Sequence, residues 1–468
     1  MTTGSASGHG FSFYSHWIEP LPAVKLSALF GGMRLKANPT GAIMRNQYPR
    51  TGLIAGCVML LSANAFAQDW PQWRGPGRDA KATGFNPPKT WPKALTQKWK
   101  VNVGDGVATP ALVGDRLYVF GRENGNEVVR CIDAATGKEV WQDRYEAEGA
   151  TPPAAAFSGP RSSPTVADGK VVTFGVRGTF SCYDAATGKK LWRKDAAKGM
   201  WPRFFASSSP IVVDGLCIAQ LGGQKNGGIT ALDLATGQEK WKWAGDGPAY
   251  ASPVLLTVDG AKLIVALTEG KIVAVNSADG KLVWETPFVA AQRNYNAATP
   301  IVDGQTIIYA GGGRGIKAVK IDKQGDGFTA KELWSNPKES VQFNTPVLKD
   351  GKLYGLSQTN EIFCVNADTG KTSWTASAGG AAPAGGQGGG RGRGGRGAGY
   401  GSIVDAGSIL LVLTPSSELI VFEPNDNKYV EQARIKVADT PTYAYPVVSG
   451  NRLFVKDKDA LILWTTEG

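Results

Sequence analysis

The stretch Cys131-Ile132-Asp133-Ala134-Ala135-Thr136-Gly137-Lys138-Glu139-Val140-Trp141 decides the fold, because copies of it return along the chain. Close copies end at Trp192, Trp241, Trp284 and Trp374, and a looser copy ends at Trp334. A Thr-Pro or Ser-Pro pair, such as Ser163-Pro164, precedes each copy. Two further copies, from Gly401 to about Val437 and from Tyr445-Pro446 to Trp464, bring the total to eight repeats of about 40–55 residues. A period of this length is typical of repeat architectures.

Each repeat predicts four short antiparallel strands, since apolar residues alternate and no helical periodicity is present. The Asp or Asn of the marker favours a turn closed by its own side chain, and the Gly supplies a left-handed residue for a tight hairpin. The Trp begins the outer strand, where its indole can lie flat against the neighbouring repeat. We expect this docking role for Trp99, Trp141, Trp192, Trp241, Trp284, Trp334 and Trp374.

The ends of the chain predict a closed ring. The last repeat stops at Gly468 without an outer strand, whereas the segment Gln97–Val101 has the outer-strand pattern ahead of the first full repeat. An N-terminal strand that completes the last blade would leave neither edge unpaired. The predicted fold is therefore all-β: an eight-bladed β-propeller over residues 95–468, built from tryptophan-docking repeats and closed by an N-terminal strand in the last blade.

The region before the propeller predicts export. Residues 44–67 combine a basic start, an apolar run from Thr51 and the sequence Ala65-Phe66-Ala67, as in a secretory signal peptide. We expect synthesis to begin at Met44, residues 1–43 to be a non-native extension, and cleavage to leave Gln68 first. Cleavage and lipidation at Cys57 is the alternative. The apolar run is too short for a transmembrane helix, which needs about 20 residues, so the predicted location is the periplasm or the exterior.

Composition excludes much enzyme chemistry. The only histidines, His9 and His16, precede the predicted cleavage site, so the mature chain has no histidine for a Ser-His-Asp triad or a zinc site. After cleavage, 46 basic and 39 acidic residues remain, a net charge of +7. This scattered excess predicts no nucleic-acid binding.

The marker resembles the tryptophan-docking repeat of the pyrroloquinoline-quinone dehydrogenases and of their cofactor-free relatives, which include the propeller lipoprotein of the bacterial outer-membrane barrel assembly machinery. The opening Asp69-Trp70-Pro71-Gln72-Trp73-Arg74-Gly75-Pro76 also resembles the start of the secreted branch of this family. For a dehydrogenase, the resemblance implies a vicinal disulfide over the quinone, a Trp floor, a calcium ion held by Glu and Asn, and an Asp base.

The cysteines argue against such an enzyme. No two of Cys131, Cys182, Cys217 and Cys364 are adjacent, and three of them occupy the position that Ala231 and Ala274 fill in other repeats. Equivalent positions in stacked sheets are about 10 Å apart, beyond the reach of a disulfide. We expect these cysteines to be small, buried and reduced.

Residues just before each Thr/Ser-Pro pair are predicted to line one mouth of the central channel, because these links return from an outer strand to the next inner strand. Repeated arginine, aromatic and carboxamide side chains there favour an anionic or planar ligand, although the same residues could cap the channel by bonding to backbone carbonyls. The candidates are Arg161, Arg203, Phe204, Tyr250, Arg293, Asn296, Asn344 and Tyr445. Arg161, Arg203 and Arg293 are expected to converge in one funnel.

Two segments fall outside the repeats. Residues 376–399 form a Gly/Ala tract with Arg391, Arg393 and Arg396, and predict a disordered loop. Residues 68–94, which we call the leader, are too few for a domain, and their Trp residues predict that they dock on the propeller.

The functional prediction is a monomeric, exported, non-catalytic propeller that serves as a binding platform in the cell envelope, without cofactor or metal. Its partner would be an envelope protein, an anionic small molecule or a glycan. The alternative is a dehydrogenase of alcohols or sugars that uses pyrroloquinoline quinone with calcium.

Overall fold

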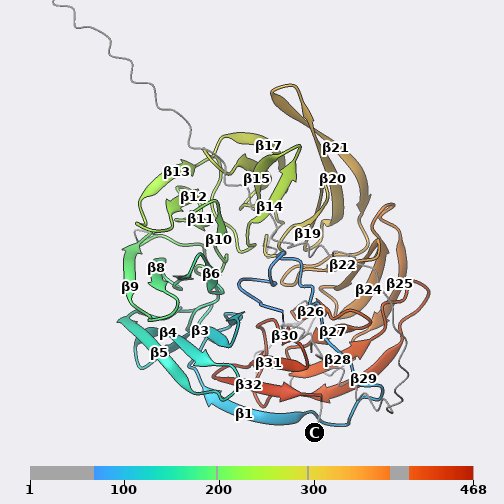
Figure 1. Cartoon of the computed structure of the whole chain (residues 1–468). Helices are drawn as coiled ribbons and strands as arrows, with labels where there is room; N and C mark the ends of the chain where they lie inside the picture. Colours follow the sequence, from blue (N-terminus) through green and yellow to red (C-terminus); the bar gives the residue numbers. More distant parts are fainter. Residues whose placement is uncertain (1–67, 197–198, 292–294, 380–399, 467–468) are drawn as a thin grey trace, which may run out of the picture. The chain divides into compact units, whose positions relative to one another are not determined.

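The computed structural model describes residues 68–196, 199–291, 295–379 and 400–466, all within the unit Ala63–Gly468. The predicted extension 1–43, the predicted signal peptide 44–67 with Cys57, and Arg293 lie outside these ranges. The described residues form eight four-stranded antiparallel sheets, arranged as the blades of an eight-bladed propeller (Figure 1). The all-β prediction and the blade number are confirmed.

Each blade runs from an inner to an outer strand. Blade 1 consists of β2 (Ala111–Val113), β3 (Arg116–Glu123), β4 (Asn126–Asp133) and β5 (Glu139–Glu146). Blade 2 consists of β6 (Thr165–Ala167), β7 (Lys170–Phe174), β8 (Thr179–Asp184) and β9 (Lys190–Asp195). Blade 3 consists of β10 (Ile211–Val213), β11 (Leu216–Leu221), β12 (Gly228–Asp233) and β13 (Glu239–Trp243). Blade 4 consists of β14 (Val254–Val258), β15 (Ala261–Leu267), β16 (Lys271–Asn276) and β17 (Leu282–Pro287).

The second half of the ring repeats this order. Blade 5 consists of β18 (Ile301–Asp303), β19 (Thr306–Gly311), β20 (Gly315–Gln324) and β21 (Gly327–Asn336). Blade 6 consists of β22 (Val347–Lys349), β23 (Lys352–Leu356), β24 (Glu361–Asn366) and β25 (Thr372–Ser377). Blade 7 consists of β26 (Ser402–Asp405), β27 (Leu410–Leu413), β28 (Glu418–Phe422) and β29 (Glu431–Lys436). Blade 8 consists of β30 (Val447–Ser449), β31 (Arg452–Lys456), β32 (Ala460–Thr465) and β1 (Thr96–Asn102).

Strand β1 closes the ring, as the sequence predicts. It pairs antiparallel with β32, for example Val101 with Leu461, and so supplies the outer strand of the last blade. A buried lysine adds to this closure: the Lys456 ammonium donates to the carbonyl oxygens of Gly104 at 3.3 Å and Gly106 at 2.7 Å, just beyond β1. It also donates to the carbonyl oxygens of Asp457 and Lys458, so four acceptors surround the charge.

The core lies between neighbouring blades. Middle strands such as β4 and β16 are buried along almost their whole length, because each face of a blade packs on the next blade. Outer strands such as β5 alternate between exposed and half-buried residues, since their outward face meets solvent. This explains why nearly all side chains of the middle strands are buried and those of the outer strands alternate.

The marker tryptophans dock each blade on the next one. The indole nitrogen of Trp241, for example, donates to the carbonyl oxygen of Ser277 at 3.0 Å. Equivalent bonds to the next blade's turn are made by Trp99, Trp141, Trp192, Trp334 and Trp374. The turn glycine lies under the ring: a Cβ atom at Gly280, where φ is +71°, would stand 2.4 Å from the Trp241 indole. The marker therefore needs Gly for both its backbone conformation and its missing side chain.

Two blades depart from this pattern. Blade 5 replaces the short turn by the long β20–β21 hairpin, and Phe328 of this hairpin packs with Trp284 against the core shared by blades 4 and 5. Blade 7 has no marker tryptophan, and there Trp464 of β32 donates to the carbonyl oxygen of Val437 at 3.0 Å. An aromatic side chain thus packs at the interface of blades 4 and 5 and at the interface of blades 7 and 8.

The segment predicted to be a disordered loop, 376–399, overlaps strand β25 at its start. Ala376 pairs with Ile362 and Ser377 pairs with Glu361, so β25 extends two residues into the predicted loop. The strand continues because its backbone completes the ladder with β24 whatever its side chains are. Residues 380–399, with Arg391, Arg393 and Arg396, lie outside the described residues. The four cysteines of the propeller are buried and free, as predicted: Cys131, Cys182, Cys217 and Cys364.

Candidate functional site

An open ring of hydrogen bonds joins the inner ends of seven blades, at the Thr/Ser-Pro pairs and at Tyr445-Pro446. The backbone N–H of Thr109 donates to the Ser163 hydroxyl at 3.1 Å, and that of Ser163 donates to the Ser209 hydroxyl at 2.9 Å. The same bond links Ser209 to Ser252, Ser252 to Thr299, Thr299 to Thr345, and Tyr445 back to Thr109. The hydroxyl group of the residue before the proline therefore accepts a hydrogen bond from the neighbouring blade. The sequence pattern alone did not indicate this role.

Seven links, those leading into blades 2 to 8, each contribute an aromatic ring on the mouth side of this hydrogen-bonded ring. Phe204, Tyr250 and Tyr295 pack edge to face, with centroids 4.9–6.1 Å apart. Phe343 stacks on Tyr400 at 4.2 Å, Tyr400 meets Tyr443 at 5.2 Å, and Tyr443 meets Phe157 at 4.9 Å. We call these seven half-buried residues the aromatic collar. They pack in two groups, Phe204 with Tyr250 and Tyr295, and Phe343 and Phe157 with Tyr400 and Tyr443, so the collar is an aromatic surface.

Of the three arginines predicted to converge, Arg161 and Arg203 are described, and their side chains have different surroundings. Arg161 turns into its own link and donates to the carbonyl oxygens of Ala154, Phe157 and Gly159 at 2.8–3.2 Å. Burial lowers the pKa of its guanidinium, against the nearby charge of Asp105. Arg203 is exposed, with its guanidinium 5.7 Å from the Phe204 ring centroid. Arg161 thus acts as a structural cap, and Arg203 is the more exposed of the two.

The other candidates divide in the same way. Asn296 is 2% exposed and its amide nitrogen donates to the carbonyl oxygens of Thr268, Glu269 and Phe288, so this side chain holds the link together. Asn344 is equally buried and donates to the carbonyl oxygen of Leu356 at 2.7 Å. Phe204 and Tyr250 belong to the collar, and the Tyr250 hydroxyl accepts from the Phe204 N–H at 3.2 Å. Burial raises the pKa of Tyr250 to about 12.

The remaining candidate, Tyr445, lies inside the channel. It is 2% exposed and contacts two leader residues: Trp73 edge to face at 4.8 Å and the Arg74 guanidinium at 5.6 Å. The leader thus occupies the middle of the ring, where Figure 1 shows its blue trace between the inner strands. Sequence reasoning predicts a docked leader, but nothing in the repeat pattern indicates that it enters the channel.

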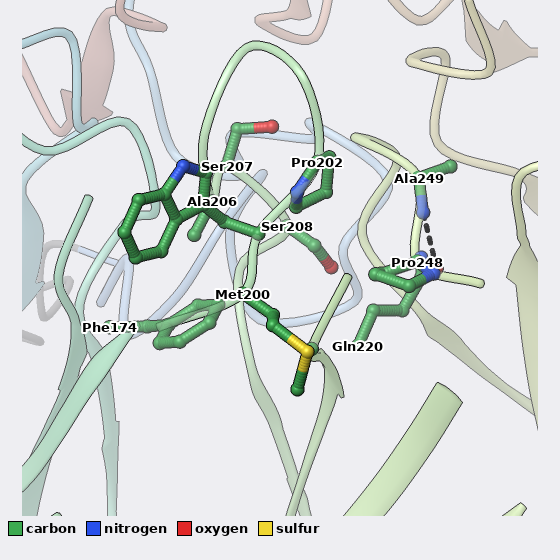
Figure 2. A pocket seen from close by; sticks show the side chains of 11 residues that line it. Phe174, Met200, Pro202, Ala206, Ser207, Ser208, Gln220, Pro248 and Ala249 are labelled. Atoms are coloured by element: carbon green, nitrogen blue, oxygen red, sulfur yellow. Dashed lines mark hydrogen bonds between the residues drawn. The ribbon is translucent and has the colours of Figure 1, made fainter. Parts of the chain in front are cut away.

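A small cavity lies beside the collar, between blades 2, 3 and 4 (Figure 2). Phe174, Met200, Ser207, Ser208 and Pro248 are among its lining residues, and Gln220 closes one side by accepting from the Ala249 N–H at 2.9 Å. About 10 Å³ is open to the centre of a water molecule, which is room for about one water. The cavity cannot hold an organic cofactor.

A buried carboxyl group, Glu127, joins blades 1 and 2. It is 1% exposed, accepts from the Val176 N–H at 2.7 Å and accepts from the Tyr145 hydroxyl. Burial raises its pKa above the usual value. A raised carboxyl pKa in a cleft would suggest a catalytic acid, but this group is enclosed between two sheets and bonded on both oxygens. We assign it to the stability of the seam.

Other features bear on ligands and membranes. Within the described part of the chain, no group of three or more His, Cys, Asp or Glu side chains is placed to hold a metal ion. In the same residues, no helix is long and apolar enough to cross a lipid bilayer.

Known proteins of similar sequence include outer membrane protein assembly factors and quinohemoprotein alcohol dehydrogenases. The family model described as "Outer membrane protein assembly factor BamB" matches residues 89–243 and 125–376, more than half of the chain. The chain belongs to this BamB family. Among curated proteins, BamB of Yersinia pestis is 25% identical over 299 residues, covering 60% of this chain and 70% of that protein. The quinohemoprotein alcohol dehydrogenase of Comamonas testosteroni is 30% identical over 157 residues, covering 32% of this chain and 22% of the enzyme.

Solved structures agree with this membership at the level of the fold. The crystal structure of BamB from Moraxella catarrhalis matches with a TM-score of 0.57 and 17% identity, covering 80% of this chain and 100% of that one. The dehydrogenase from Comamonas testosteroni matches with a TM-score of 0.61 and 14% identity, covering 86% and 81%. Both the BamB family and the quinoprotein enzymes thus share this propeller architecture.

The quinone of the enzyme relatives does not fit the residues present here. The described cysteines are buried inside separate blades, and burial raises the pKa of Cys131 to about 11 and that of Cys182 to about 12. Inside the channel the leader residues Trp73 and Arg74 contact Tyr445, and the aromatic collar lies on the mouth side. No step of a quinone-dependent reaction can be derived from this arrangement.

Proposed function

We propose that this chain is an exported, non-catalytic propeller of the BamB family that binds another envelope protein through its mouth face. The relatives named outer membrane protein assembly factors favour a role in protein assembly. One observation carries the proposal: the leader lies inside the channel, where Trp73 and Arg74 contact Tyr445, and the aromatic collar lies on the mouth side. Recognition must then use the surface of the ring.

The mouth face carries chemistry suited to a protein partner. Arg203 is exposed beside the half-buried rings of Phe204, Tyr250 and Tyr295. Arginine next to aromatic side chains is the composition that is enriched at the energetic centres of protein interfaces. The exposed guanidinium favours an acidic residue on the partner, because a bidentate bond to a carboxylate adds both energy and direction.

Export is part of the proposal. Gln68 is the first described residue, and its carbonyl oxygen accepts from the Ser449 hydroxyl at 2.8 Å. A mature chain that starts at Gln68, after cleavage behind Ala67, would keep this contact with blade 8. Edman sequencing of the periplasmic protein expressed from Met44 tests this, and a lipidated Cys57 at the N-terminus would contradict it.

Photocrosslinking in intact cells tests the binding face. A photoreactive amino acid replaces Arg203 on the mouth face in one variant. In the control variant it replaces Lys138, in a turn at the opposite end of the strands. We expect a discrete crosslinked envelope protein from position 203 and none from position 138. Equal crosslinking from both positions, or a crosslinked glycan in place of a protein, would overturn the proposal.

A second measurement addresses the enzyme alternative. Pyrroloquinoline quinone and calcium are added to the purified mature protein, and absorbance, melting temperature and dye-linked oxidation of alcohols and sugars are followed together. We expect no change in any of them. A higher melting temperature accompanied by turnover would establish the dehydrogenase instead.

A further inference from the structure

The first part of the leader, Gln68–Phe85, touches almost every blade from inside the ring. Its backbone pairs with Leu112 of blade 1 through Trp70, with N–H···O distances of 2.7 and 2.8 Å, and with Asp405 of blade 7 through Ala80 and Ala82. Further contacts reach Val166 of blade 2, Ser209 and Pro210 of blade 3, Thr299 of blade 5, Pro346 of blade 6, and Ser449 and Tyr445 of blade 8. This short segment thus contacts seven of the eight blades, and we call Gln68–Phe85 the hub.

Two arginines of the leader are almost completely buried where they contact the channel wall. Arg74 is 0% exposed and donates to the Pro346 carbonyl oxygen at 2.8 Å, while Arg78 is 4% exposed and donates to the carbonyl oxygens of Ser209 and Pro210 at 3.0 and 2.9 Å. These acceptors belong to the residues of the Thr/Ser-Pro pairs in blades 3 and 6. No carboxylate of the described residues forms an ion pair with either arginine. The channel wall therefore offers two carbonyl sockets for guanidinium groups, on different sides of the axis.

The leader is folded around these sockets. Arg74, Arg78 and Ala80 have φ values of 60°, 55° and 60°, in the left-handed region that non-glycine residues rarely adopt. Turn bonds from Gly75 to Gln72 and from Ala80 to Arg74 hold the bend. Such conformations cost free energy and persist where surrounding contacts repay it. The surrounding contacts here are those with the channel wall. The leader therefore has this conformation as bound to the ring.

The ring is complete without the leader. All strands of the eight sheets begin at Thr96 or later, and the leader contributes isolated bridges at Trp70 and Lys81 alone. Between the hub and β1, Asn86, Lys89, Thr90, Lys93 and Ala94 are exposed. The connection is thus an accessible tether between two parts that contact each other noncovalently.

We propose that the central channel is a peptide-binding site, and that its occupant is the chain's own segment Gln68–Phe85, bound in cis through Trp70, Trp73 and the two arginine sockets. The class of ligand is an extended peptide with tryptophan and arginine side chains. The site lies on the channel axis and is separate from the mouth face proposed to bind a partner.

The test uses the full chain with a protease recognition sequence inserted between Lys89 and Thr90. After cleavage, size-exclusion chromatography shows whether the fragment stays with the ring, and circular dichroism shows whether the ring stays folded. A fluorescent synthetic peptide of sequence Gln68–Phe85 is then added in excess to replace the fragment. The comparison peptide carries Arg74→Ala and Arg78→Ala, and the matched control carries Thr83→Ala at an exposed position.

We expect the fragment to remain bound after cleavage and the labelled peptide to exchange with it. The double-arginine peptide should bind at least about tenfold more weakly than the Thr83→Ala control, since hydrogen bonds from charged donors are each worth about a factor of ten or more. Loss of the fragment on cleavage, unfolding of the ring, or equal binding of both variant peptides would overturn the proposal. A concentration-dependent dimer held by exchanged leaders would contradict binding in cis.

Discussion

Trp241 of blade 3 lies directly on Gly280 of blade 4, so that a Cβ atom at Gly280 would come within 2.4 Å of the indole ring. The same pair recurs between other blades: Trp99 with Gly137, Trp141 with Gly188, Trp192 with Gly237, and Trp334 with Gly370. Two residues about 40 positions apart in sequence thereby fix the spacing between blades. Replacing the glycine of such a pair by alanine has two costs in stability, one from the left-handed backbone and one from the collision with the indole ring.

Gly280→Ala should lower the free energy of unfolding by about 2–4 kcal/mol, combining a left-handed backbone with a collision against the Trp241 ring. The control is Gly260→Ala in the same blade, where φ is +81° and no atom lies within 4 Å of the added Cβ. We expect a loss of about 1 kcal/mol there, from the backbone alone. Urea unfolding followed by tryptophan fluorescence measures both. Equal losses would show that the indole contact adds nothing.

Trp241→Ala should destabilise the ring by about 3–5 kcal/mol, because a large buried side chain leaves a cavity between two blades. Trp70→Ala should instead release the leader while the ring melts with a smaller loss, since a hub that forms no blade can open locally. Limited proteolysis at the leader, compared with the melting temperature of the ring, distinguishes the two variants. If both changes lowered the melting temperature equally, leader and ring would form a single cooperative unit.

Arg161→Ala should cost about 1.5–3 kcal/mol of stability, because it removes charged hydrogen bonds to three backbone carbonyls. Arg203→Ala should change stability by less than about 0.5 kcal/mol, as is usual for an exposed side chain, but should weaken binding of the crosslinked partner. Melting curves and partner binding are measured for both proteins. A large stability loss at Arg203 with unchanged binding would make it a cap like Arg161.

Stability should rise with pH through the titration of Lys456. Burial lowers the pKa of its ammonium from 10.5 to about 8, against the attraction of the nearby Asp457, Asp105 and Asp459. Between these two pH values the unfolded chain holds a proton that the folded chain has lost, so the free energy of unfolding increases as pH rises.

The increase attributable to Lys456 amounts to about 3 kcal/mol between pH 8 and pH 10.5, at about 1.4 kcal/mol per pH unit. Lys456→Met lacks the titrating group, so its stability, measured by denaturant unfolding at several pH values, should follow a flatter curve. Other groups titrate equally in both proteins. Parallel curves for the two proteins would contradict the assignment.

The local pattern was sufficient for the ring itself. An Asp or Asn, a left-handed Gly and a Trp at fixed spacing specify a hairpin and its docking surface. Eight copies, together with an N-terminal strand that completes the last blade, specify closure of the ring, and the pairing of β1 with β32 confirms it. These features are readable because the residues that interact are close in sequence or occupy equivalent places in successive repeats. Blade 5 shows the limit of the pattern. A short turn is predicted there, but the structure has the long β20–β21 hairpin, whose Phe328 packs against the core.

The candidate site was less predictable, because a link places a residue at the mouth without fixing where its side chain points. Arg161 and Arg203 occupy corresponding links, yet one bonds to its own backbone and the other meets solvent. The leader depended on tertiary structure altogether: Arg74 and its acceptor Pro346 are 272 residues apart. The sequence determined the blades, their number and their closure, through contacts repeated at fixed spacing. Tertiary structure alone decided what fills the channel, because a buried guanidinium takes whichever carbonyl oxygens the closed ring presents to it.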